Sequence, residues 1–315
     1  MTLVPNLQSA TAMPAAAKPR PRAALKAPWQ IWLGTDGRLS ILRLIAIAFL
    51  LTPVAIAVYD FRTVGFGARP INDVIHRTGY WTLIFLLTAL AVTPLRRVAR
   101  FNQLVDIRRI IGVGAFVYAA THISLFIADQ KFDLGKVVGE IVLRLYLTIG
   151  FVALLGLATL AVTSTDGWVR RLGAKRWQLL HQAIYLIAAL ALIHYFQQTK
   201  ADVSVPTFVA GLAGWLIGYR LLVKLRGGRT EPPTWMILAL SVVAAALTFV
   251  CEAIGIALAF KVSPWMVLRL NFEVDFDMLD MIRPGWQVLG AGLCVVAVDW
   301  IRARFARPRR GGGKA

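Results

Sequence analysis

The stretch RWQLLHQAIYLIAALALIHY (residues 176–195) is long and apolar enough to cross a membrane, yet it carries a histidine near each end. About 20 mostly apolar residues are needed to span the ~30 Å hydrocarbon core of a bilayer. Ionisable side chains are costly in that medium, and in membrane helices they usually mark a functional site. His181 and His194 therefore raise the question of what they bind.

The rest of the chain repeats this apolar pattern. Of its 315 residues 58% are hydrophobic, and the mean hydropathy is +0.65. Apolar stretches predict membrane helices near residues 41–60, 76–94, 109–128, 143–163, 177–197, 205–223, 234–260 and 284–302. We therefore predict an all-α, polytopic membrane helix bundle with a six-helix core and two extra C-terminal helices.

Three regions follow from this division. Residues 1–39 are rich in Ala, Pro, Lys and Arg, lack the apolar core of a signal peptide, and are predicted to be a disordered cytoplasmic tail. Residues 40–225 would form the six-span core. Residues 226–315 would form a two-span extension with an acidic outer segment, NFEVDFDMLDM (271–281), and a short cytoplasmic tail.

The net charge of +19 indicates membrane orientation rather than a nucleic-acid partner, because the basic residues lie in short loops between apolar runs. With the N-terminus inside, the inner segments hold 25 of the 35 Lys and Arg residues. An excess of Lys and Arg marks the cytoplasmic side. An even number of spans then places both termini in the cytoplasm, with the lipid bilayer as the surrounding partner.

Depth in the membrane decides which histidines can share a ligand. At 1.5 Å per residue, His122 lies roughly 20 Å from the inner end of its span, and His194 about 26 Å from the inner end of its own. The two spans run in the same direction, so both imidazoles reach the outer half of the membrane. Neutral imidazole is a common ligand of haem iron. We predict that His122 and His194 bind one haem iron between two helices.

The other two histidines are assigned less directly. His181 lies only about 6 Å into its span, and it is rotated by about 220° from His194 on an ideal helix. Either this helix is distorted or the two histidines serve different ligands, so His181 is a candidate for a second metal or redox site. His76 opens the second span on the outer side, and with Arg77 it is a candidate contact for a haem propionate or another anionic cofactor.

Other chemistries fit the pattern less well. A zinc site needs ligands about 2 Å from one ion, and His181 lies at the wrong depth to join the other histidines. Cys251 and Cys294 form no CxxC motif. GVGAF (112–116) follows no strand, so no dinucleotide-binding domain is indicated. A proton-coupled transporter stays open as an alternative, although only Glu252 is an acid well inside a span.

Three consecutive stretches carry a family resemblance. INDVIHRTGYWTLIFLLTALAVTPLRR (71–97), RRIIGVGAFVYAATHISLF (108–126) and LAVTSTDGWVRRLGAKRWQLLHQAIYLIAALALIHY (160–195) resemble the MsrQ family of the ferric-reductase-like transmembrane superfamily. The resemblance extends over roughly residues 40–225 and includes all four histidines. By it, His122, His181 and His194 match the haem-region histidines, and His76 matches one at the start of the second span.

The resemblance implies a function and partners. Members of this family are bacterial inner-membrane subunits that bind haem b, are associated with FMN, and pass electrons from membrane quinol to MsrP, a periplasmic molybdopterin methionine sulfoxide reductase. Such a subunit transfers electrons without catalysing the sulfoxide reduction itself. The basic loop TSTDGWVRRLGAKRW (163–177) is either a contact for an anionic cofactor or an orienting loop. Electron transfer to another acceptor, such as ferric iron, is the alternative within redox chemistry.

Overall fold

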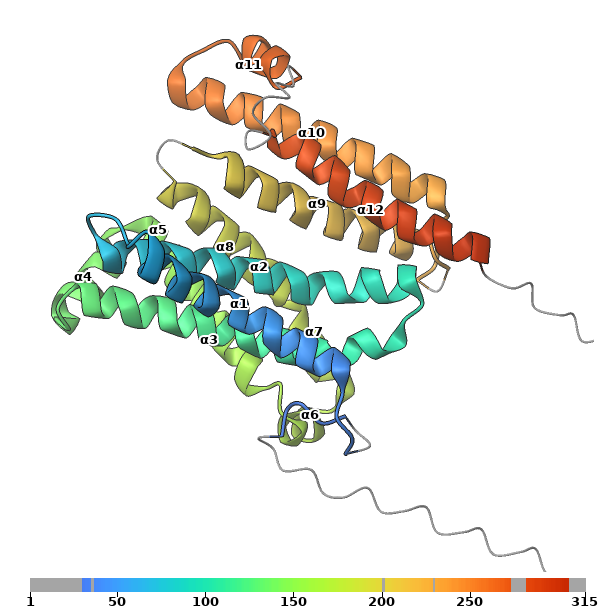
Figure 1. Cartoon of the computed structure of the whole chain (residues 1–315), viewed down its shortest axis with the longest axis horizontal. Helices are drawn as coiled ribbons and strands as arrows, with labels where there is room; N and C mark the ends of the chain where they lie inside the picture. The colour runs from blue at the N-terminus through green and yellow to red at the C-terminus, as the bar shows by residue number, and fades with distance from the viewer. Residues whose placement is uncertain (1–29, 35–36, 200–201, 229, 273–281, 306–315) are drawn as a thin grey trace, which may run out of the picture.

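The computed structural model describes residues 30–34, 37–199, 202–228, 230–272 and 282–305, and it shows a bundle of helices (Figure 1). Over these residues the chain contains no β-sheet, only an isolated antiparallel bridge between Leu33 and Leu39. The prediction of an all-α, polytopic membrane bundle is confirmed. Most of the predicted tail (1–29, 35–36), most of the acidic segment (273–281) and the C-terminal end (306–315) lie outside the described residues.

The helices follow the predicted order along the chain. Their bounds are α1 Ile41–Thr63, α2 Pro70–Ala99, η1 Asn102–Leu104, α3 Val105–Asp129, α4 Leu134–Leu143, α5 Leu145–Val162, α6 Asp166–Leu172, α7 Ala174–Gln182, α8 Ile184–Gln198, α9 Ser204–Leu225, α10 Thr234–Phe260, α11 Pro264–Leu270 and α12 Pro284–Phe305.

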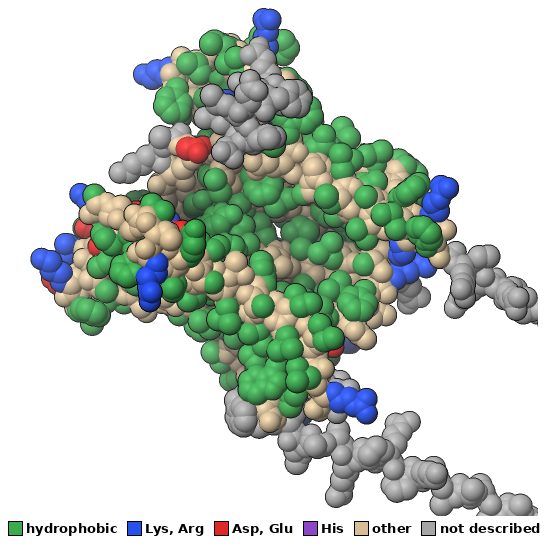
Figure 2. All heavy atoms as spheres, in the orientation of Figure 1, with side chains coloured by type: hydrophobic (Ala, Val, Ile, Leu, Met, Phe, Trp, Pro, Cys, Tyr) green, Lys and Arg blue, Asp and Glu red, His purple; other side chains and the backbone are tan. Residues whose placement is uncertain are grey.

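Seven helical stretches of the described chain are long and apolar enough to cross a membrane. Two of them combine adjacent elements: η1 continues into α3, and α7 into α8. The eighth predicted span is present as helix α12, which packs along α10 and α9 but is not one of the seven. Figure 2 shows apolar side chains spread over the surface of the bundle, with Lys and Arg gathered toward its ends. An apolar girdle with charged ends is the surface that a bilayer requires.

Helix α2 lies at the centre of the core and packs most extensively against α3. It continues to Ala99 through Pro94, five residues beyond the predicted end of this span. Proline has no N–H, so Pro94 leaves the carbonyl of Leu90 without its helical donor. Arg220 of α9 supplies that donor from its guanidinium, and its charge lies over the ring of Tyr185 at 5.6 Å. A half-buried arginine thus supplies the missing hydrogen bond, because a backbone carbonyl inside a membrane needs a donor from the protein.

The C-terminal helices pack tightly onto the core. Trp215 Nε1 of α9 donates to Ser241 Oγ of α10 at 3.0 Å, and both side chains are buried. Gly292 of α12 lies against the same serine, because a Cβ at this position would stand 2.3 Å from Ser241 Oγ. Small residues that let helix backbones approach closely are the usual basis of packing between membrane helices. Helices α9, α10 and α12 therefore form one packed unit.

This close approach makes Gly292 sensitive to substitution. We expect Gly292→Ala to destabilise the protein by about 1–3 kcal/mol, because α12 must move away from α10 to make room for a methyl group. Thermal unfolding in detergent, followed by circular dichroism, measures the effect.

Gly290 provides a matched control two residues away in the same helix, because nothing lies within 4 Å of a Cβ there. Gly290→Ala should leave the unfolding midpoint unchanged or raise it slightly, since alanine favours a helix over glycine. Equal effects of the two substitutions would contradict the packing of α12 on α10.

Candidate functional site

Four helices bring His122 and His194 together. His122 lies on α3 and His194 on α8, and their ring centroids stand 6.3 Å apart with an interplanar angle of 84°. Helices α2 and α5 complete the surroundings, since α2 packs against α3 and α5 against α8. The two histidines that the sequence placed at similar depth thus form a facing pair.

Each ring of this pair is held by a backbone carbonyl of a neighbouring helix. His122 Nδ1 lies 2.8 Å from the carbonyl oxygen of Ile75, and His194 Nδ1 lies 2.7 Å from that of Tyr146. A carbonyl oxygen can only accept, so both Nδ1 atoms carry the proton and donate it. Each neutral ring then keeps its lone pair on Nε2, and among the described residues neither Nε2 has a hydrogen-bond partner.

A glycine lies four residues after each accepting carbonyl. In α2, Ile75 is followed by Gly79, and a Cβ there would lie 3.1 Å from His122 Cε1. In α5, Tyr146 is followed by Gly150, and a Cβ there would lie only 2.7 Å from His194 Nδ1. The carbonyl of residue i in a helix points toward residue i+4, so a side chain at i+4 would block the approach of a ring. The same local arrangement thus occurs twice.

The pair has the chemistry of a two-imidazole metal site. A metal–imidazole bond of about 2.0–2.1 Å places two rings that bind one ion from opposite sides with their centroids about 6 Å apart. The observed 6.3 Å agrees with this separation. Histidine ligands of metals usually donate their second ring N–H to a carbonyl or carboxylate, which fixes the tautomer and the ring orientation. Both features suit an iron held between the Nε2 atoms.

A cavity of about 390 Å³ lies near the start of α2 and the end of α8, and neither His122 nor His194 is among its lining residues. It is lined by His76, Arg77, Tyr80, Tyr195, Gln198 and Thr199. The predicted contacts His76 and Arg77 therefore share one cavity with the residue that follows His194. Arg77 is also engaged elsewhere: it forms an ion pair with Asp60 and lies over the ring of Phe66 at 5.7 Å.

His181 lies apart from the pair. Its ring stacks on Trp177 with centroids 3.9 Å apart, and its Nε2 lies 3.3 Å from Thr163 Oγ1. Trp177 Nε1 in turn donates to the carbonyl of Thr163 at 2.8 Å. The helix is interrupted between the two histidines at Ala183, whose N–H donates to the carbonyl three residues back, at Leu180. The helix is therefore distorted, which is one of the two alternatives from the sequence, and whether His181 and His194 serve different ligands stays a prediction.

The basic loop at 163–177 folds into α6 and the start of α7. Arg109 of α3 donates to Asp166 at 2.7 Å, and this hydrogen bond and the positive charge hold the pKa of the Asp166 carboxyl below its usual value. Arg171 lies over the ring of Trp168 at 5.5 Å. The contact between Arg109 and Asp166 joins the loop to α3, and whether the loop also meets an anionic cofactor stays a prediction.

The sequence did not predict the backbone carbonyls, the glycines or the tyrosines around the histidine pair. The accepting carbonyls belong to Ile75 and Tyr146, and any residue supplies a carbonyl. The two glycines were detectable only as small residues within apolar helices. Tyr195 adjoins His194, and Tyr80 follows His76 by one helical turn, so both cavity tyrosines had a signal in the sequence.

Comparison with known proteins places this site in a family. A family described as "Ferric reductase like transmembrane component" matches residues 76–192, which include His76, His122 and His181 and end two residues before His194. A protein of Rhodospirillum rubrum named "Protein-methionine-sulfoxide reductase heme-binding subunit MsrQ" is 45% identical over 175 residues, covering 84% of its own length and 55% of this chain. The chain belongs to the MsrQ family.

Other MsrQ proteins agree with this assignment. That of Herminiimonas arsenicoxydans is 43% identical over 162 residues, with 72% of its length and 50% of this chain covered. That of Xanthomonas oryzae is 39% identical over 191 residues, with 87% and 58% covered. More than two fifths of this chain thus lies outside each of these matches. No solved structure matches the chain.

Proposed function

We propose that this chain is a membrane b-type cytochrome that carries electrons from membrane quinol to an MsrP-like molybdopterin methionine sulfoxide reductase on the outer side. The observation that carries the proposal is the facing pair His122 and His194, with both Nδ1 atoms bonded to carbonyls and both Nε2 atoms left as ligands. The names of its relatives supply haem binding and the methionine sulfoxide reductase system.

The residues of the pair would do three things for a bound haem b. They would hold it through two Nε2 atoms, orient it through the fixed tautomers, and keep substrate from the iron, because both imidazoles would occupy it. A haem held there supplies one-electron redox chemistry between ferric and ferrous iron. The chain would therefore relay electrons, and the sulfoxide would be reduced by the partner.

Residues 40–225 would form the haem-binding core and 226–315 an extension, in a bacterial inner membrane with both termini cytoplasmic. The excess of Lys and Arg on one side supports this orientation. His76 and Arg77 would contact haem propionates from the adjoining cavity, while His181 would support a second metal site. FMN is proposed from the family resemblance alone.

The ligand assignment has a direct spectroscopic test. We expect the purified protein to show a six-coordinate, low-spin b-type spectrum, and His122→Ala and His194→Ala each to abolish it, because each removes one axial ligand. His181→Ala is the control and should leave the low-spin signal of the pair in place, since its ring lies against Trp177 and Thr163. If both His122→Ala and His194→Ala keep the wild-type spectrum, the assignment is wrong.

The glycine behind His194 gives a second, more selective test. Gly150→Ala should displace the imidazole from the Tyr146 carbonyl and reduce haem occupancy by roughly tenfold or more, the usual effect of losing a metal ligand's outer partner. Gly214→Ala in α9 is the matched control, because nothing lies within 4 Å of a Cβ there. Haem content per protein is read from the pyridine haemochrome spectrum. Equal haem content in the two variants would argue against the carbonyl as an orienting group.

Electron transfer is tested with the protein in lipid nanodiscs. We expect reduced quinol to reduce the haem, and a purified periplasmic molybdopterin methionine sulfoxide reductase with its substrate to reoxidise it. The double variant His122→Ala/His194→Ala should do neither. Reoxidation by a ferric chelate but not by the reductase would assign the chain to a different acceptor, and failure of quinol to reduce the haem would exclude quinol as the donor.

A further inference from the structure

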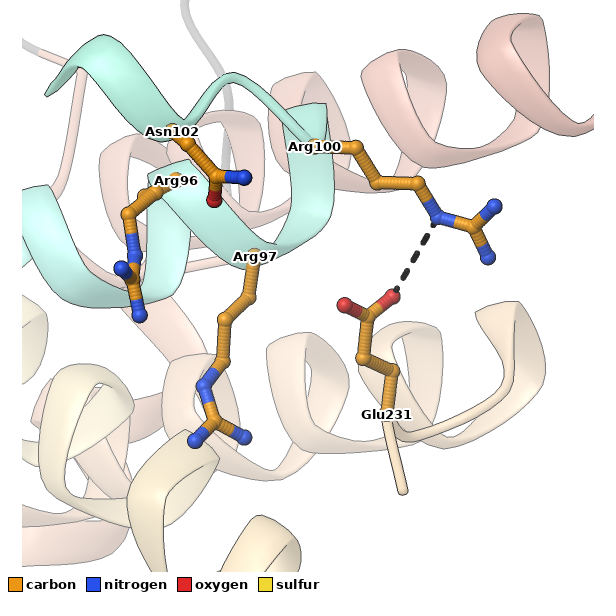
Figure 3. A pocket seen from close by; sticks show the side chains of 5 residues that line it. All are labelled: Arg96, Arg97, Arg100, Asn102 and Glu231. Atoms are coloured by element: carbon orange, nitrogen blue, oxygen red, sulfur yellow. Dashed lines mark ion pairs between the residues drawn. The ribbon is translucent and has the colours of Figure 1, made fainter. Parts of the chain in front are cut away.

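A second cavity lies at the other end of α2, far along the helix from His76. It measures about 570 Å³ and is lined by Arg96, Arg97, Arg100, Asn102 and Glu231; we call it the arginine pocket. Figure 3 shows Arg96 and Arg97 extending from the end of α2, with Glu231 reaching toward Arg100 from the segment before α10. The pocket therefore lies between the core and the C-terminal extension.

The positive charges of this pocket are only partly compensated. Glu231 Oε2 lies 3.9 Å from Arg100 Nε and 3.8 Å from Arg302 Nη1, both longer than a hydrogen bond. Arg97 donates to the carbonyl of Gly228 at 3.2 Å. Arg96 has no side-chain hydrogen bond or ion pair within the described residues. Three guanidinium groups and one carboxylate line the pocket, which leaves an excess of two positive charges.

The pocket lies where membrane spans end. Helix α2 ends at Ala99, and the pocket's Glu231 lies between the end of α9 at Leu225 and the start of α10 at Thr234. The ends of spanning helices lie at the level of lipid headgroups. In the proposed orientation this is the cytoplasmic leaflet, where basic pockets between helices bind anionic headgroups. Guanidinium groups bind phosphate through two parallel N–H groups, which matches a site with several arginines.

We propose that the arginine pocket binds the phosphate group of an anionic phospholipid of the inner leaflet. Arg96 and Arg97 are the main contacts, because Glu231 partly neutralises the charge of Arg100. The bound lipid joins the core helix α2 to the extension, because the pocket takes residues from both. The choice of leaflet rests on the orientation given under the proposed function, but the binding of phosphate does not.

The test uses the full-length protein in detergent, titrated with phosphatidylglycerol and observed by native mass spectrometry. Arg96→Gln/Arg97→Gln should weaken phosphatidylglycerol binding by roughly thirtyfold, because each cation near a headgroup contributes about fivefold to the affinity. Glu231→Gln should strengthen binding by about fivefold, because it removes the negative charge from the pocket. A gain of affinity cannot come from misfolding, so this variant keeps the test decisive.

Lys224→Gln/Arg226→Gln is the matched control. It removes two positive charges from the neighbouring end of α9 without altering the lining of the pocket, so phosphatidylglycerol binding should fall by no more than about threefold. Equal losses of phosphatidylglycerol affinity in the two double variants would show that the lipid responds only to the general surface charge, and would contradict the arginine pocket as its binding site. Wild-type affinity in Arg96→Gln/Arg97→Gln, or no gain in Glu231→Gln, would do the same.

A second arm separates lipid from soluble phosphate. We expect inorganic phosphate at millimolar concentration not to displace phosphatidylglycerol. Displacement that depends on Arg96 and Arg97 would contradict a lipid as the ligand and would assign the pocket to a soluble phosphate compound. The haem spectrum is recorded on the same samples, so a failure of lipid binding and a failure of the proposed haem site are read separately.

Discussion

The hydrogen bonds from two imidazole Nδ1 atoms to backbone carbonyls are the constraint on which the proposed site depends. A neutral histidine has one donor and one acceptor nitrogen, and a carbonyl accepts only, so each bond leaves the lone pair on Nε2. In an apolar membrane interior such a bond is not in competition with water. The rings of His122 and His194 are thereby fixed in tautomer and direction before any metal is considered.

Two glycines make these bonds sterically accessible. In a helix the carbonyl of Ile75 or Tyr146 already faces the residue four positions later, and a side chain at that position would stand in the path of the ring. Gly79 and Gly150 remove the obstruction, and the close distances to a hypothetical Cβ show how little space is left. The same principle, a small residue that permits close approach, packs α12 onto α10 at Gly292. Small residues thus organise both the site and the extension.

Polar side chains inside the bundle supply hydrogen bonds that the helix backbones lack and join neighbouring helices. Pro94 deprives the Leu90 carbonyl of its donor, and Arg220 from another helix provides one. Five residues before Arg220 in α9, Trp215 donates to Ser241 and joins α9 to α10. Because α9 contacts both α2 and α10, it links the region around the histidine pair to the C-terminal helices. Helices α10 and α12 therefore continue the packed bundle along α9.

The sequence alone determined the class of the molecule and the identity of the paired histidines. An apolar run of about 20 residues predicts a membrane helix, because a helix satisfies its backbone hydrogen bonds within the span. The rise per residue of a helix converts sequence position into depth in the membrane, so counting residues was enough to match His122 with His194. The rotation of one helix against another, the break at Ala183 that separates His181 from His194, and the carbonyls that receive Nδ1 depend on how helices pack. These were decided only by the tertiary structure, because every residue offers the same carbonyl and packing alone selects the one that an imidazole meets.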